Sequence, residues 1–283
     1  MDGFPLFSTN FKAPQLMGIL NVTTDSFSDG GKFADPEQAL AQAQILVDAG
    51  ADILDVGGES TRPGALPVPV SEELRRMLPV LLKVREKWPN LPVSVDTRNS
   101  AVAEAAIDLG ATYINDISAL SHDPRMAEIV AARPKVKLVL MHMRGQPETM
   151  QADPVYANLL AEISSFFAQR IEFAVTRGID RANIILDPGI GFGKTAEHNF
   201  RLLAHLGEFR KYGLPLLLGV SRKRFIASVD ASGPQERIGG TLAAAVLAAW
   251  QGVDILRVHD VREHRQFFAV LQAIGREAGP WKF

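Results

Sequence analysis

Residues 50–55 read GADILD, and the same pattern returns as GATYIN at residues 110–115 and as GVDILR at residues 252–257. Each copy begins with a glycine that ends a helical pattern and continues into a short apolar run whose polar end lies five residues past the glycine. A helix followed directly by a buried strand is the repeating unit of parallel α/β folds. The three copies therefore predict a chain built from βα units.

The whole chain alternates apolar runs with helical patterns. The runs end at Asn21, Asp55, Asp96, Asn115 and Asp116, His142, Asp187, Ser221 to Lys223, and Arg257 and His259. Helices are predicted over 36–49, 71–87, 99–109, 124–132, 158–177, 197–206, 237–251 and 261–278, with Asp35 and Ser71 as the first two N-caps. Eight strand–helix units in 283 residues give about 35 residues each, the length of one βα repeat.

Two architectures fit eight such units. A doubly wound open sheet normally carries a GxGxxG loop after its first strand, whereas here the first strand is followed by NVTTDSFSDGGKF. A (β/α)8 barrel instead gathers its functional groups at the carboxyl ends of the strands, where this chain has its polar endings. We predict an α/β fold, a single (β/α)8 TIM barrel over residues 1–283.

The composition indicates a soluble enzyme. The chain is 47% hydrophobic and 22% charged, with a net charge of −2 and no run of five basic residues, so nucleic acid is not an expected partner. The absence of cysteine excludes disulfides, thiolate catalysis and zinc–thiolate sites and fits a reducing compartment. There is no secretory signal pattern, and the longest apolar stretch, 242–250, is too short to span a bilayer. We expect a cytoplasmic protein that binds no membrane.

Basic side chains cluster at the ends of the seventh and eighth strands. Lys223, Arg222, Arg257 and His259 together predict an anion site, because phosphate sites in barrels often lie there. A barrel closes its last strand onto its first, so Asn21 becomes a neighbour and could supply an oxygen to Mg²⁺ beside a pyrophosphate.

Acidic and amide side chains end the third, fourth and sixth strands. Asp96, Asn115 and Asp187 would suit a ligand rich in N–H donors, such as a pterin or a purine, with Met141 and Phe192 against its ring faces. Structural alternatives stay open. Asp96 or Thr97 could cap the following helix, Asp187 could belong to a turn with Pro188, and Met141 could be a core residue.

Three glycine-rich segments follow strands. Residues 21–32 and 57–64, which include Arg62, are either long surface loops or lids that order over a polyanion. Gly189, Gly191 and Gly193 in DPGIGFGK could let a ligand approach the backbone closely.

Several motifs in this order resemble those of the dihydropteroate synthase family of pterin-binding enzymes, over nearly the whole chain. They are GILNVTTDSFSDGG, DVGGESTRPG, VSVDT, YINDIS, MHMRGQPETMQ, DPGIGFGK, GVSRK and RIGGTLAAAVLAAWQGVDILRVHDV. The family usually has proline where Thr24 stands.

The resemblance implies an activity and a set of binding residues. The reaction would join 6-hydroxymethyl-7,8-dihydropterin pyrophosphate to p-aminobenzoate with Mg²⁺, releasing pyrophosphate, in a homodimer that sulfonamides inhibit. The matching positions are Asp96, Asn115, Asp187, Lys223 and Met141 for the pterin, Asn21, Arg62, Arg257 and His259 for pyrophosphate, and Thr61, Pro63, Phe192 and Ser221 for p-aminobenzoate. Asp96, Lys223 and Asn21 would be catalytic, and Asn21 would be the metal ligand.

Two other activities remain as alternatives. A pterin-barrel methyltransferase would share groups like Asp96 and Asn115 but would not need the basic end, and a non-catalytic pterin-binding paralogue would keep the pocket alone. Asp55 and His142 are interpreted as structural, or as residues that support the binding residues without touching the ligand.

Overall fold

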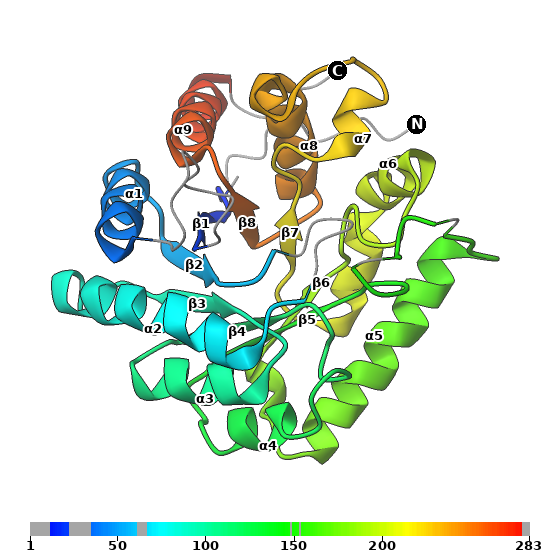
Figure 1. The fold of residues 1–283 in the computed structure, drawn as a ribbon. Helices are drawn as coiled ribbons and strands as arrows, with labels where there is room; N and C mark the ends of the chain where they lie inside the picture. The colour runs from blue at the N-terminus through cyan, green and yellow to red at the C-terminus, as the bar shows by residue number, and fades with distance from the viewer. Residues whose placement is uncertain (1–11, 23–34, 61–66, 148, 153, 279–283) are drawn as a thin grey trace.

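A computed structural model of the chain describes residues 12–22, 35–60, 67–147, 149–152 and 154–278 (Figure 1). Its strands are β1 Gln15–Asn21, β2 Ile53–Gly57, β3 Val93–Asp96, β4 Tyr113–Asp116, β5 Lys137–Met141, β6 Ile184–Asp187, β7 Leu217–Gly219 and β8 Ile255–Val258. They form one eight-stranded sheet in the order β6-β5-β4-β3-β2-β1-β8-β7. All seven pairs are parallel, and a parallel bridge from Leu186 to Leu216 joins the two ends of the sheet. The predicted (β/α)8 barrel is confirmed.

Helices surround the barrel (Figure 1). They are α1 Pro36–Asp48, α2 Val70–Lys87, α3 Ser100–Asp108, α4 Met126–Ala131, α5 Leu159–Thr176, α6 Ala196–Ala204, α7 Arg224–Ala227, α8 Ile238–Trp250 and α9 Val261–Ala278. Short 3₁₀ turns lie at Arg181–Asn183, Leu206–Tyr212 and Pro234–Glu236. Among the described helices, α7 is the one that the sequence patterns do not predict, because four residues are too few to show a period. Within those residues, no helix has both the length and the apolarity needed to cross a bilayer.

Local signals explain several helix ends. The Asp35 side chain accepts a hydrogen bond from the Glu37 N–H at 2.9 Å, and Pro36 occupies the first turn of α1 as predicted. The prediction that Ser71 caps α2 is wrong, because α2 begins one residue earlier, after Pro69, with no side-chain cap. The glycine that opens each copy of the repeat has a positive φ, +95° at residue 50, which lets the chain leave its helix.

The inside of the barrel changes from apolar to polar along the strands. One end is filled by a cluster of seven residues, namely Met17, Ile53, Tyr113, Val139, Ile185, Leu217 and Ile255. Side chains of a strand alternate between its faces, so the residue two positions further on points into the same interior. That residue is polar in four strands: Asp55 in β2, Asn115 in β4, Asp187 in β6 and Arg257 in β8. The strand period thus places an apolar plug beneath a polar ring at the carboxyl ends.

Candidate active site

Arg257 stands at the centre of the polar ring, between two buried carboxylates. Its Nε lies 2.6 Å from Oδ2 of Asp55, and its Nη2 lies 2.9 Å from Oδ2 of Asp96. Asp55 is fully buried, and the Arg257 side chain is 21% exposed. The sequence interpretation separated an acidic half of the rim from a basic half, whereas this guanidinium joins them. Asp55, expected to be structural or to support the binding residues, accepts from Arg257 and orients it.

The β3 and β4 ends present two buried acceptors. Burial raises the pKa of Asp96 to about 7, while the charge of Arg257 opposes this rise and that of Asp55 adds to it. Asn115 pairs in register with Asp96, and its side-chain oxygen is buried with no hydrogen-bond partner among the described residues. A buried acceptor without a donor is costly unless a ligand supplies one, so Asn115 fits the predicted recognition of N–H groups. Asp96 does not cap α3. At the N-terminus of α3, the Ser100 N–H donates instead to the carboxylate of Asp123 at 2.9 Å.

The β6 end carries Asp187, and Lys223 reaches toward it from the loop after β7. Asp187 is 6% exposed, and its Oδ1 accepts from the Gly189 N–H at 2.8 Å. Burial raises the pKa of Asp187, which the Gly189 hydrogen bond and the charge of Lys223 oppose. Lys223 donates to the Ile190 carbonyl, its Nζ lies 4.5 Å from the centre of the Phe192 ring, and burial lowers its pKa to about 8. The structure therefore brings Asp187, Lys223 and Phe192 together.

The remaining predicted residues lie beside these groups. Met141 is 3% exposed and pairs in register with Asp187. The Ser221 hydroxyl lies 2.9 Å from Nδ1 of His259 and accepts from the His259 N–H at 3.2 Å, which links the ends of β7 and β8. Arg222 is not part of this group. Its Nε and Nη2 both donate to the carboxylate of Asp260, which compensates the charge of Arg222.

Gly57 lies between Asn21 and Asp96 in the register of β1, β2 and β3. A methyl group added at Gly57 would lie 3.9 Å from Oδ1 of Asn21 and 3.8 Å from Oδ2 of Asp96. Side-chain oxygens of this kind suit Mg²⁺, which takes few protein ligands and completes its shell with water and phosphate. Within the described residues no group of three or more His, Asp or Glu side chains forms a metal cage. The residues present fit a magnesium ion that is bound together with a phosphate ligand.

Three features of the site escaped sequence reasoning. One is the pairing of Asp55 with Arg257. Another is a buried lysine, Lys194, which the motif DPGIGFGK contains but whose burial no local pattern signals. The last is an ion pair behind the β2 and β3 ends.

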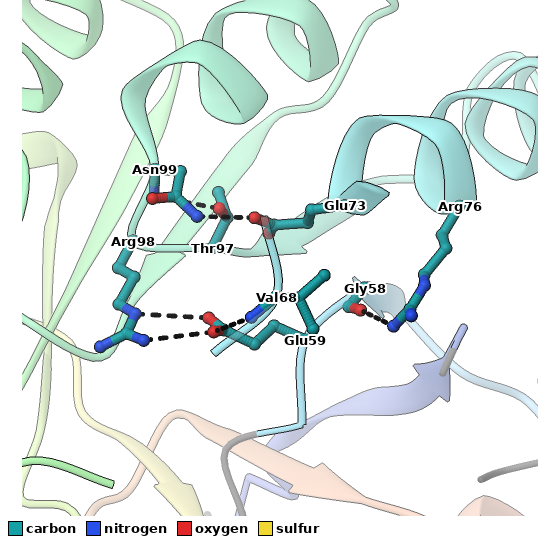
Figure 2. Close-up of polar contacts among 8 residues, drawn as sticks. All are labelled: Gly58, Glu59, Val68, Glu73, Arg76, Thr97, Arg98 and Asn99. Carbon is teal, nitrogen blue, oxygen red and sulfur yellow. Dashed lines mark hydrogen bonds and ion pairs between the residues drawn. The ribbon is translucent and has the colours of Figure 1, made fainter. Parts of the chain in front are cut away.

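That ion pair joins Glu59 to Arg98, at 3.2 Å from Oε1 to Nη2, and Glu59 also accepts from the Val68 N–H at 3.1 Å (Figure 2). Nearby, Asn99 donates to the buried Glu73 at 2.7 Å. A pattern search could have found Glu59 and Arg98 only as single charges beside the motifs. Thr61, Arg62 and Pro63, together with Thr24, lie outside the described residues.

Pterin-binding enzymes match this chain over residues 17–259, so the chain belongs to that family. The dihydropteroate synthase of Escherichia coli strain K12 is 46% identical over 266 residues, which cover 94% of this chain and 93% of the relative. A Yersinia pestis dihydropteroate synthase solved with a sulfonamide drug superposes with a TM-score of 0.87 at 46% identity, covering 92% of this chain and 94% of that one. A Xanthomonas albilineans dihydropteroate synthase in complex with 7,8-dihydropteroate gives 0.83 at 42% identity, with 94% and 95% covered. Among the pterin-binding enzymes, the chain belongs to the dihydropteroate synthase family of transferases.

Proposed function

We propose that the site joins 6-hydroxymethyl-7,8-dihydropterin pyrophosphate to p-aminobenzoate, giving 7,8-dihydropteroate and pyrophosphate. The observation that carries the proposal is the buried ring of Asp96, Asn115 and Asp187, closed by Lys223 and Arg257 at the carboxyl ends of the strands. Such a ring offers acceptors to the amino and N–H groups of a pterin and cations to an anion beside it.

The pterin is placed in the half of the ring formed by β3, β4 and β6. Asn115 supplies an acceptor that lacks a donor within the described residues, and Asp96 and Asp187 supply carboxylates that are more than nine-tenths buried. A buried polar group discriminates strongly, because a ligand without the matching donor leaves it unpaired. Met141 is assigned to one face of the bound pterin, and the Phe192–Lys223 pair is assigned to the other face.

The pyrophosphate is assigned to Asn21, Arg257 and His259, with Arg62 from outside the described residues. Arg257 and His259 are neighbours on β8 and its following loop, and Asn21 lies on the adjacent strand β1. Mg²⁺, when bound by Asn21, would neutralise phosphate oxygens and so make pyrophosphate a better leaving group. p-Aminobenzoate is assigned to Thr61, Pro63, Phe192 and Ser221, and we expect sulfonamides to compete there.

The chemistry is proposed to be dissociative. The bond from the pterin methylene carbon to the pyrophosphate oxygen breaks, and the electron pair leaves with pyrophosphate. The cation spreads into the ring, where the buried carboxylate of Asp96 offsets its charge. The amine of p-aminobenzoate then forms the C–N bond and releases a proton to solvent. Because an aryl amine is neutral near pH 7, the step needs no strong base.

Pyrophosphate release tests the proposal. Purified protein is incubated with the dihydropterin pyrophosphate and Mg²⁺, with and without p-aminobenzoate. We expect release that depends on the amine and on Mg²⁺. Release that ignores the amine, or no release at all, would refute the proposed reaction.

The homodimer and the cytoplasmic location remain predictions of this proposal. From the sequence, the candidates for the dimer contact are the small-residue helix over 241–251 and the apolar face of Phe267, Phe268 and Leu271. Phe268 is 3% exposed and Phe267 and Leu271 pack against the core, so the second of these faces lies largely on the barrel. Val270 and Ile274, one turn apart on α9, are 54% and 45% exposed and support α9 as the contact helix. Light scattering of the purified protein measures the oligomeric state.

A further inference from the structure

Lys194 is a buried junction between the loops that follow β5 and β6. It is 2% exposed, and its Nζ lies 2.9 Å from the Gly189 carbonyl and 3.0 Å from the Phe192 carbonyl. The same Nζ lies 3.0 Å from Nδ1 of His142 and 3.3 Å from the His142 carbonyl. An ammonium group has three N–H donors and no acceptor, so all of its donors are used here.

The charges fit a protonated lysine beside a neutral histidine. Burial lowers the pKa of His142 to about 2, and the charge of Lys194 adds to this effect, so the His142 ring is neutral. Burial also lowers the pKa of Lys194, while the negative charge of Asp187 opposes that shift. Three backbone carbonyl oxygens around Nζ favour the ammonium form, and Nδ1 of His142 accepts from it when the ring proton is on Nε2.

The residues that Lys194 holds are the ones that place the site. Gly189 accepts from Lys194 through its carbonyl and donates to Asp187 Oδ1 through its N–H at 2.8 Å. A movement of this peptide segment therefore moves the donor that orients the carboxylate.

The same loop also places Lys223. The Ile190 carbonyl, one residue further on, accepts from Lys223, and the Phe192 ring lies 4.5 Å from the Lys223 ammonium. Phe192 is in turn held through its own carbonyl by Lys194. One buried side chain thus fixes both sides of the segment that positions the site lysine.

The loop is also pressed against its neighbour, which leaves little room for rearrangement. A Cβ at Gly189 would lie 2.0 Å from the His142 carbonyl oxygen, and one at Gly193 would lie 2.2 Å from the Arg144 carbonyl oxygen. The sequence suggested that these glycines let a ligand approach the backbone. In the structure Gly189 and Gly193 make their close contacts with the loop after β5, whereas Gly191 lies against Lys223. Lys194 donates to the His142 carbonyl across the two loops, beside the hydrogen bonds from Gln151 to the Gly191 carbonyl and from Tyr156 to the Gly193 carbonyl.

We propose that Lys194 is a positioning residue of the pterin site, which acts through Gly189 and Phe192 on Asp187 and Lys223. The inference rests on the proposed function, because it assigns Asp187 and Lys223 to the pterin. A role in stability alone would lower the melting temperature without changing the affinity of the protein that remains folded.

Lys194→Met tests this, with Leu81→Ala as the control for lost stability, because Leu81 is 2% exposed in the outer core on α2, away from both loops. Circular dichroism gives the melting temperature, and calorimetry well below it gives the Kd for 7,8-dihydropteroate. We expect at least a tenfold higher Kd for Lys194→Met and a Kd within twofold of wild type for Leu81→Ala. A Kd within twofold for folded Lys194→Met would overturn the proposal. If that variant does not fold, Lys194→Gln, which keeps one donor group, is held to the same threshold.

A double-mutant cycle with Asp187→Asn separates a path through Asp187 from a general loosening. We expect Lys194→Met to weaken binding by much less in the Asp187→Asn background than in wild type. Additive losses would overturn the proposed path. Wild-type protein that does not bind 7,8-dihydropteroate would instead refute the proposed function, so the two failures are distinguishable.

Discussion

Replacing Arg257 with methionine should lower stability strongly, because it leaves two buried carboxylates without their cation. The guanidinium contacts Asp55 at 2.6 Å and Asp96 at 2.9 Å, and Asp55 is fully buried with its Oδ1 lacking a partner among the described residues. Removing one partner of a buried ion pair costs about 3–5 kcal/mol. Since Arg257 is 21% exposed, we take the lower end, about 3 kcal/mol. At about 2–4 °C per kcal/mol, the melting temperature should fall by about 6–12 °C.

The loss should depend on pH in a defined direction. Burial already raises the pKa of Asp96 to about 7 against the opposing charge of Arg257, so without Arg257 this pKa rises further and the folded variant binds more protons than the unfolded chain. Stability of that kind is present at low pH and is lost as pH rises through the raised pKa. The difference in the free energy of unfolding between Arg257→Met and wild type should therefore be larger at pH 8 than at pH 5, as measured by thermal and urea unfolding.

Arg222→Met is the matched control. Arg222 also pairs with a carboxylate, but its partner Asp260 is 15% exposed, so we expect a loss of about 1 kcal/mol. Adding Asp55→Asn to Arg257→Met should recover part of the loss, because one buried charge is then gone. A fall of less than 2 °C at pH 8, or equal losses for Arg257→Met and Arg222→Met, would refute the reasoning.

Three further variants probe the site itself. Lys223→Ala should raise the Kd for 7,8-dihydropteroate and lower kcat together, each by about tenfold or more, because a charge-assisted contact is lost; unchanged values in calorimetry and steady-state kinetics would remove Lys223 from the pocket. Asn115→Leu should leave the melting temperature within about 2 °C, since its side-chain oxygen has no partner among the described residues, yet weaken pterin binding by about tenfold; a stability loss with normal binding would contradict this. His259→Ala should weaken binding of the pyrophosphate substrate more than that of the pterin alcohol, and equal losses would argue against the anion assignment.

The strand endings were predictable because they follow a local rule. A residue two positions past a buried interior side chain shares its direction, so Asp55, Asn115, Asp187 and Arg257 could be assigned to one rim from the sequence alone. The barrel itself follows from the same repeats. Helix ends were less predictable. The sequence predicts Ser71 as the N-cap of α2, but α2 begins after Pro69 with backbone hydrogen bonds and no side-chain cap.

Side-chain partners across the rim were not predictable. Arg257 is 202 residues from Asp55 and 161 from Asp96, and no local pattern shows that it contacts both. In the sequence Arg222 and Arg257 are both basic residues near the end of a strand, yet in the structure Arg222 forms an ion pair with Asp260. Lys194 follows a glycine-rich loop, and no local pattern in the sequence signals its burial. Its burial depends on carbonyls from a second loop, which only the fold brings near.

The most direct test of the proposed reaction measures both products in one sample. Wild-type protein is given 6-hydroxymethyl-7,8-dihydropterin pyrophosphate, p-aminobenzoate and Mg²⁺. Pyrophosphate is then measured by a coupled assay, and 7,8-dihydropteroate is measured by mass spectrometry. The account predicts equal amounts of the two products, with neither formed when p-aminobenzoate is omitted. Protein that binds the pterin but forms no 7,8-dihydropteroate would contradict it.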